Sequence, residues 1–138
     1  MNIIVDTDAL LGLFNAIDAL HKSAAMLAEK LTEERANIFL LPTTLAEFAL
    51  LASSRVGVQQ TKTAIDHLTQ SGYIPVDVTE ELTKEAVSLY QKQTSKEESL
   101  FDCYVMVAAR KITADYIFSF DGGYTKNGFS LASGMLSS

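Results

Sequence analysis

Four acidic residues stand where apolar segments begin, end or are interrupted. They are Asp6, Glu47, Asp102 and Asp121. Two of them directly follow apolar strand-like runs, residues 3–5 and 115–120. A third opens an apolar helix, and Glu47 is a lone acid among apolar neighbours. Carboxylates that gather in one place remain ionised together only when cations neutralise them. Such a group predicts a Mg²⁺ or Mn²⁺ site that hydrolyses phosphodiesters by metal-activated water.

Each acid also has an ordinary explanation. Asp6 or Asp8 could cap the first helix, and Asp102 could be the N-cap of a later one. Glu47 could form a surface salt bridge, and Asp121, before two glycines, could be a turn residue. All of these explanations must hold together for the site to vanish. The acidic site is therefore the favoured interpretation, since buried charges are paired or coordinate metals.

The elements that must position these acids alternate along the chain. Apolar runs predict strands at residues 37–41 and 73–76 in addition to 3–5 and 115–120. Periodic patterns predict helices at 9–17, 18–34, 57–70, 79–93 and 100–112, and one that Thr43 or Thr44 caps after Pro42 ends a strand. Pro75 indicates an edge strand, and residues 94–99 are expected to form a loop. The alternation favours an α/β domain with a mostly parallel sheet, whose strands would bring the acids to one rim.

Composition limits the remaining possibilities. The 138 residues predict one domain spanning 1–138, and the single cysteine, Cys103, allows no disulfide within the chain. The formal net charge of −6 argues against nucleic-acid binding unless bound cations reverse the local field. We find no apolar run long enough to span a membrane and no signal-peptide pattern, so a cytoplasmic protein is expected.

The chain resembles the PIN-domain ribonucleases in four segments that occur in the family's order. Asp6 lies in Ile-Ile-Val-Asp-Thr-Asp, and Glu47 lies in Thr-Thr-Leu-Ala-Glu-Phe. Asp102 lies in Leu-Phe-Asp-Cys-Tyr, and Asp121 lies in Ser-Phe-Asp-Gly-Gly. The resemblance implies a three-layer α/β/α sandwich with a central, mostly parallel sheet. It also implies Mg²⁺-dependent cleavage of RNA and, for a VapC-type toxin, a small antitoxin partner and a homodimer.

The resemblance assigns a role to each site residue. Asp6, Asp102 and Asp121 would bind the metal directly or through water, and Glu47 would bind it or position the attacking water. Asp8 occupies a position where the family more often has a small neutral residue, so it would be an additional outer ligand. Cys103 replaces a small residue. The hydroxyls of Thr7 and Ser119 could orient the acids or serve only as caps.

Other residues have weaker assignments. Candidates for phosphate contacts are Arg55, Lys62, Arg110, Lys111 and Lys126, for which solvated helix faces are the alternative. Candidates for base stacking are Phe120, Tyr124 and Phe129, with core packing favoured for Phe120. His21 and His67 are expected to be exposed or half-buried residues of helices away from the site. Apolar residues of the first two helices either form a dimer or antitoxin surface or pack in the core: Leu10, Leu11, Leu13, Phe14, Met26 and Leu27.

Three other functions are open. A PIN-type nuclease could process RNA without being a toxin, and a PIN-like domain could bind partners without catalysis. The Asp6-Thr-Asp start also resembles aspartyl-nucleophile phosphatases of the haloacid-dehalogenase type. That family has Thr or Val where this chain has Leu10, which disfavours the third alternative.

Overall fold

The computed structural model describes residues 1–94 and 96–137. Within them, one four-stranded sheet forms the centre, with strands β1 (Asn2–Val5), β2 (Asn37–Leu40), β3 (Ile74–Pro75) and β4 (Tyr116–Phe118). The strands pair in the order β3-β2-β1-β4, and each pair is parallel. All four carboxyl ends therefore lie at the same edge of the sheet.

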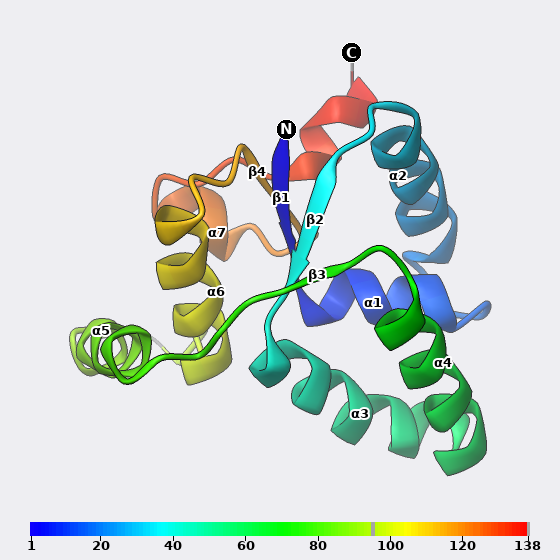
Figure 1. Cartoon of the computed structure of the whole chain (residues 1–138), viewed down its shortest axis with the longest axis horizontal. Helices are drawn as coiled ribbons and strands as arrows, with labels where there is room; N and C mark the ends of the chain where they lie inside the picture. The colour runs from blue at the N-terminus through cyan, green and yellow to red at the C-terminus, as the bar shows by residue number, and fades with distance from the viewer. Residues whose placement is uncertain (95, 138) are drawn as a thin grey trace.

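Helices cover both faces of this sheet (Figure 1). One face packs against α1 (Thr7–Phe14), α2 (His21–Glu33), α3 (Pro42–Val56), α4 (Val58–Gln70) and the short 3₁₀ helix η1 (Ala132–Ser137). The other packs against α5 (Glu80–Gln91), α6 (Leu100–Lys111) and α7 (Gly123–Lys126). The predicted three-layer α/β/α sandwich is confirmed.

The central strand β1 explains why the fold has two cores. Ile3, Ile4 and Val5 are all 0% exposed. Ile3 and Val5 point into the core under α1–α4, whereas Ile4 points into the core under α5–α7. Side chains alternate between the two faces of a strand, so a strand buried on both sides is a continuous apolar run.

Polar side chains shift two predicted helix boundaries. Helix α1 ends at Phe14, and α2 begins only at His21, because Asn15 and Asp18 form local turns. Their side chains accept hydrogen bonds from the backbone N–H groups of Ile17 (3.3 Å) and Leu20 (2.8 Å). The predictions of helix at 15–17 and 18–20 were wrong for this reason.

The start of α3 and the end of β4 also differ from the predictions. Pro42 is the first residue of α3, where its missing N–H costs nothing, so neither Thr43 nor Thr44 is the cap. Strand β4 stops at Phe118, which leaves Ser119 and Phe120 in the connection before Asp121.

Other predicted features are confirmed. β3, with Pro75, is an edge strand, and the Thr79 hydroxyl caps α5 by accepting from the Leu82 N–H at 3.1 Å. The loop expected at 94–99 is irregular at residues 94 and 96–99, and Ser95 lies outside the described residues. In the part of the chain that the structure describes, no helix is long and apolar enough to cross a membrane.

Candidate active site

Asp6 directly follows β1 at the carboxyl edge of the sheet and is 5% exposed. Its backbone N–H donates to the Phe118 carbonyl at 3.0 Å, which fixes it beside β4. It occupies the N-cap position of α1, yet its side chain forms no capping hydrogen bond. The capping explanation for Asp6 is therefore wrong, and its carboxylate can serve another role.

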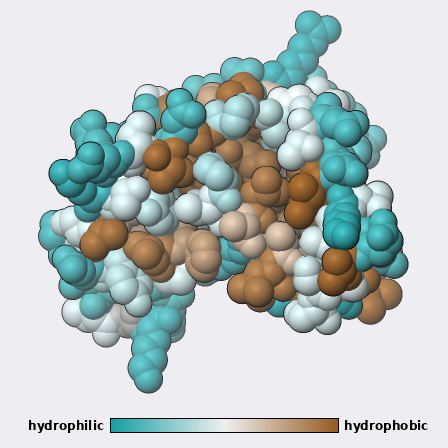
Figure 2. Space-filling view, turned by 60° about the horizontal axis from the view of Figure 1, so that its bottom comes forward, coloured by the Kyte–Doolittle hydropathy of each residue, from teal (hydrophilic) through white to brown (hydrophobic). Residues whose placement is uncertain are grey.

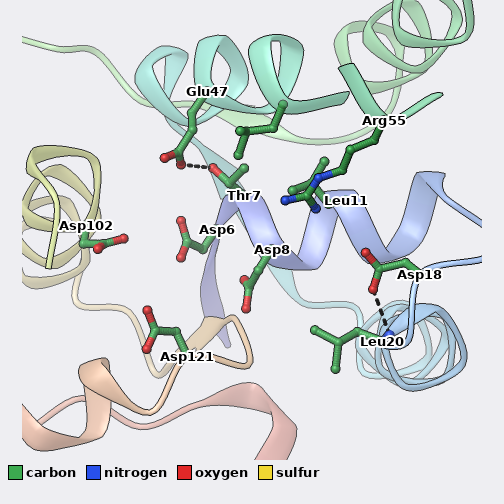
Figure 3. Close-up of a pocket in the computed structure, with 11 residues that line it drawn as sticks. Asp6, Thr7, Asp8, Leu11, Asp18, Leu20, Glu47, Arg55, Asp102 and Asp121 are labelled. Atoms are coloured by element: carbon green, nitrogen blue, oxygen red, sulfur yellow. Dashed lines mark hydrogen bonds between the residues drawn. The ribbon is translucent and has the colours of Figure 1, made fainter. Parts of the chain in front are cut away.

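One cavity of about 270 Å³ brings the acids together at this edge (Figure 3). The end of β1, α3, the first turn of α6 and the segment after β4 each contribute one predicted acid to its wall. The acidic lining residues are Asp6, Asp8, Asp18, Glu47, Asp102 and Asp121. The four acids expected on one rim thus line one cavity together with Asp8, and Asp18 joins them unpredicted.

A buried tyrosine joins the first and third acids. The Tyr124 hydroxyl donates to Asp6 Oδ2 at 2.7 Å and lies 3.2 Å from Asp102 Oδ1. Tyr124 is 2% exposed, and burial next to these carboxylates raises its pKa, so the hydroxyl remains a donor. Ser119 Oγ adds a longer contact to Asp6 Oδ2 at 3.4 Å. The Asp6 carboxylate is therefore positioned from two sides.

The other oxygen of Asp102 is held by the start of α6. Ser99 is the N-cap, and its hydroxyl accepts from the Asp102 N–H at 3.2 Å. In return, Asp102 Oδ2 accepts from the Ser99 N–H at 2.9 Å, which completes a capping box. Asp102 is not the N-cap itself but lies three residues beyond it. The capping box turns this side chain toward the cavity.

Glu47 is half-buried in α3 and accepts a hydrogen bond from the Thr7 hydroxyl. This contact joins α3 to the first residue of α1 across the cavity wall. Glu47 forms no surface salt bridge in the described residues. Of the two roles predicted for the Thr7 hydroxyl, orienting an acid or capping a helix, the bond to Glu47 fits the first.

Asp8 and Asp121 differ in how completely they are bonded. Asp8 Oδ2 accepts from the Phe120 N–H at 2.7 Å, whereas its buried Oδ1 has no hydrogen-bond partner among the described residues. Asp121 is exposed, and its Oδ1 accepts from the Gly123 N–H at 2.8 Å. The turn role expected for Asp121 is thus real, but the same side chain also lines the cavity.

The acids raise one another's proton affinity. Burial, followed by the charge of Asp8, raises the pKa of Asp6 from 3.8 to about 7. Burial also raises the pKa values of Asp8 and Glu47. At neutral pH the Asp6 carboxyl is therefore only partly ionised, and a bound cation would favour its ionised form.

A sequence profile of the PIN domain matches residues 3–129, which is most of the chain. The chain belongs to the PIN domain family. The match spans the segments that contribute the cavity acids, from Asp6 to Asp121. Its PIN domain has no sequence match among well-characterised proteins.

Solved structures share this PIN fold at low sequence identity. VapC20 of Mycobacterium tuberculosis, a toxin that cleaves the sarcin-ricin loop, is 24% identical with a TM-score of 0.81; the match covers 92% of this chain and 95% of VapC20. VapBC2 of Rickettsia felis, solved on a fragment of its promoter DNA, is 17% identical with a TM-score of 0.68, covering 91% and 92%. FitAcB of Neisseria gonorrhoeae is 18% identical with a TM-score of 0.63, covering 94% and 95%.

The lining of the PIN-domain cavity fits a hard divalent cation. The acidic residues that line it offer carboxylate oxygens, which prefer Mg²⁺ or Mn²⁺ to zinc, and Asp8 leaves one buried oxygen unbonded. In the described residues, no three Asp, Glu, His or Cys side chains are yet grouped tightly enough to hold an ion. The carboxylate oxygens would have to move closer together to bind one.

The three aromatic residues predicted to stack on bases have other contacts in the structure. Tyr124 cannot stack on a base because it is buried with its hydroxyl on the acids. Phe120 packs edge-on against Phe118. The Arg110 guanidinium lies over the Phe129 ring, with its carbon 5.2 Å from the ring centre. The sequence did offer one indication of the Tyr124 role, because a buried tyrosine usually needs a hydrogen-bond partner for its hydroxyl.

The basic candidates separate clearly in the structure. Lys111 pairs with Glu81 and Glu85, and Lys126 pairs with Glu97. Lys62 is exposed on α4, and Arg55 alone of the five lines the acid cavity. His21 bonds to the Gly12 carbonyl and His67 packs against Phe14, and neither lines that cavity, as expected.

Proposed function

We propose that this PIN domain is a metal-dependent endoribonuclease that hydrolyses RNA phosphodiester bonds. The observation that carries this proposal is the convergence of six carboxylates on one cavity at the carboxyl edge of a parallel sheet. Ligand sites in such sheets lie at this edge. A bound Mg²⁺ or Mn²⁺ would neutralise the carboxylates, activate a water molecule and stabilise the leaving oxygen.

Some residues of the chain would bind that ion, and others would orient the residues that bind it. Asp6, Glu47, Asp102 and Asp121 would provide its ligands, with Asp8 as an outer carboxylate. Tyr124, Ser119 and Thr7 would orient the ligands, since each bonds to one of these acids. Because water rather than the ribose hydroxyl attacks, the products should carry a 5′-phosphate.

Cleavage of RNA by the purified chain tests the proposal. We expect cleavage with Mg²⁺ or Mn²⁺, none with EDTA, and fragments with a 5′-phosphate. Asp121→Asn is a suitable inactive variant, since Asp121 is exposed and an asparagine oxygen can still accept from the Gly123 N–H. A cyclic phosphate product, or full activity in EDTA, would rule out this mechanism.

We further propose that the nuclease is the toxin of a toxin–antitoxin pair in the cytoplasm. The fold shared with the VapC20 toxin and with VapBC2 supports this assignment. Expression should arrest growth, Asp121→Asn should abolish the arrest, and co-expression of a small protein encoded beside the gene should relieve it. Growth unaffected by the active chain would favour an RNA-processing nuclease instead.

Most of the apolar residues predicted for a partner surface pack in the core instead. Leu10, Leu11 and Leu27 are buried, and Leu13 and Phe14 pack against the core, so the core explanation holds for these five. Met26 is 50% exposed. Figure 2 shows apolar side chains on the face that carries the carboxyl edge of the sheet. We expect such side chains to serve an antitoxin or a homodimer, which sedimentation with and without the partner would test.

The alternatives predict different measurements. A catalytically silent PIN domain should show no specific Mg²⁺ or Mn²⁺ binding by calorimetry. A phosphatase should form a covalent aspartyl-phosphate, which membership of the PIN family disfavours.

A further inference from the structure

The acid cavity continues along α3 away from the acids. Glu47, Leu51 and Arg55 are spaced four residues apart on this helix, and all three line the cavity. Eight residues of α-helix rise about 12 Å, so the backbone of Arg55 lies about two turns of α3 beyond that of Glu47. Figure 3 shows the Arg55 side chain reaching back from α3 into the cavity, with its guanidinium beside Leu11.

The wall between the two ends is apolar. Leu11 from α1 and Leu51 from α3 line it. Leu20, from the segment before α2, lies beside Asp18 (Figure 3). The cavity therefore presents an acidic end, an apolar middle and an end with a cation. A nucleic-acid strand presents a matching series of a phosphate, a nucleoside and the next phosphate.

Arg55 is available for a ligand. It is the basic residue among those that line the cavity, and it forms no ion pair or hydrogen bond within the described residues. Asp18 lies at the same end, but its Oδ1 accepts from the Leu20 N–H at 2.8 Å and does not pair with Arg55. An unpaired guanidinium in an otherwise acidic cavity suits a phosphate, which it can bind through two parallel hydrogen bonds.

We propose that this end of the cavity is a subsite for the nucleotide adjacent to the scissile phosphodiester. Arg55 binds the far phosphate of that nucleotide, and Leu11 and Leu51 contact its nucleoside. The subsite rests on the proposed nuclease function. It also explains how a chain of net charge −6 retains a strand of the same sign: one cation would lie at each end of the bound nucleotide.

Binding of a labelled single-stranded RNA dodecamer of mixed sequence tests the subsite. The measurement uses fluorescence anisotropy with Mn²⁺ in the Asp121→Asn background, where the RNA stays intact. Arg55→Gln should weaken binding roughly tenfold and reduce the salt dependence of log Kd by about 0.7. Arg55→Lys should lose less RNA affinity than Arg55→Gln. Asp18→Asn should bind the RNA more tightly than the parent because it removes a negative charge from the subsite.

The matched control is Lys62→Gln, which removes an exposed, unpaired charge that does not line the cavity. It should change the affinity by less than about twofold. In the active chain, Arg55→Gln should raise KM with little change in kcat, since the contact is remote from the reacting phosphate.

Three outcomes would overturn the subsite. Arg55→Gln could bind RNA as the parent does, as expected if Arg55 serves a protein partner instead. Lys62→Gln could lose as much affinity, or the affinity loss could leave the salt dependence unchanged. If the Arg55 effects appear but the active chain does not cleave RNA with Mg²⁺ or Mn²⁺, the subsite stands and the proposed hydrolysis fails.

Discussion

Asp6 combines two properties that oppose each other in a folded protein. It is an acid that a cation requires to be ionised, yet it is 5% exposed and faces the charge of Asp8. Burial disfavours the ionised carboxylate even though the Tyr124 hydroxyl donates to it. The metal-free fold therefore carries a local instability at the point where the metal would bind.

Replacing Asp6 by Asn should separate activity from stability. Asparagine keeps an oxygen that can accept from Tyr124 but removes the charge. We expect RNA cleavage to fall by more than about 100-fold. We also expect the free energy of unfolding of the metal-free protein at pH 8 to rise by about 2 kcal/mol. Chemical denaturation in EDTA measures the second effect. A clear loss of stability would show that the charge of Asp6 supports the fold.

Tyr124→Phe should weaken metal binding while preserving the core. The ring still fills its site, but Asp6 Oδ2 loses its nearest donor and Asp102 Oδ1 loses its neighbour. We expect the affinity for Mn²⁺, measured by calorimetry, to fall about tenfold. Tyr104→Phe is the control, because its hydroxyl donates to Thr83 at 3.3 Å and Tyr104 does not line the cavity. Equal Mn²⁺ affinities in the two variants would show that the Tyr124 hydroxyl does not contribute to metal binding.

At the scale of elements, the capping box of α6 links helix stability to the site. Ser99→Ala should lower the free energy of unfolding by about 1 kcal/mol. It should also weaken Mn²⁺ binding, because the first turn of α6 holds Asp102. Thr79→Ala removes the cap of α5 and should have a similar stability cost without altering Mn²⁺ binding. Identical Mn²⁺ affinities in both variants would show that the capping box does not position Asp102.

Much of the fold and the acid set could be predicted because both depend on local pattern. The apolar run at residues 3–5 required a strand buried on both faces, and parallel strands must end together. Asp6, Asp102 and Asp121 therefore had to approach one edge. Helix ends were less predictable, since Asn15 and Asp18 bond to the backbone in competition with the helix.

The support of the acids could not be predicted in the same way. Tyr124 contacts Asp6 across 118 positions of the chain, and Ser119 contacts it across 113. No periodicity encodes such pairs, because they depend on how β4 and α7 dock against β1. The position of Arg55 likewise became clear only when α3 was seen along the cavity.

At the scale of the whole molecule, the metal-free protein should lose stability as pH rises. The folded pKa of Asp6 is about 7 and lies above its unfolded value, and the pKa values of Asp8 and Glu47 are also raised. Between the unfolded and folded pKa values the native state binds more protons, so the free energy of unfolding decreases with pH and levels off above about 7.

Thermal unfolding in EDTA from pH 5 to pH 8 checks this slope. Asp6→Asn should flatten it, and saturating Mn²⁺ at pH 8 should raise the Tm because the ion binds only the folded chain. A Tm that increases from pH 5 to pH 8 without metal would contradict the assigned direction of these shifts.

The buried carboxylate of Asp6 has one more consequence, for the solution around the protein. With a pKa of about 7, Asp6 holds about half a proton on average at neutral pH. A cation that bound here would displace that fraction, so its uptake would acidify the medium and its apparent heat would depend on the buffer that absorbs the proton. The occupancy of the proposed metal site would then depend on pH as well as on the concentration of magnesium or manganese.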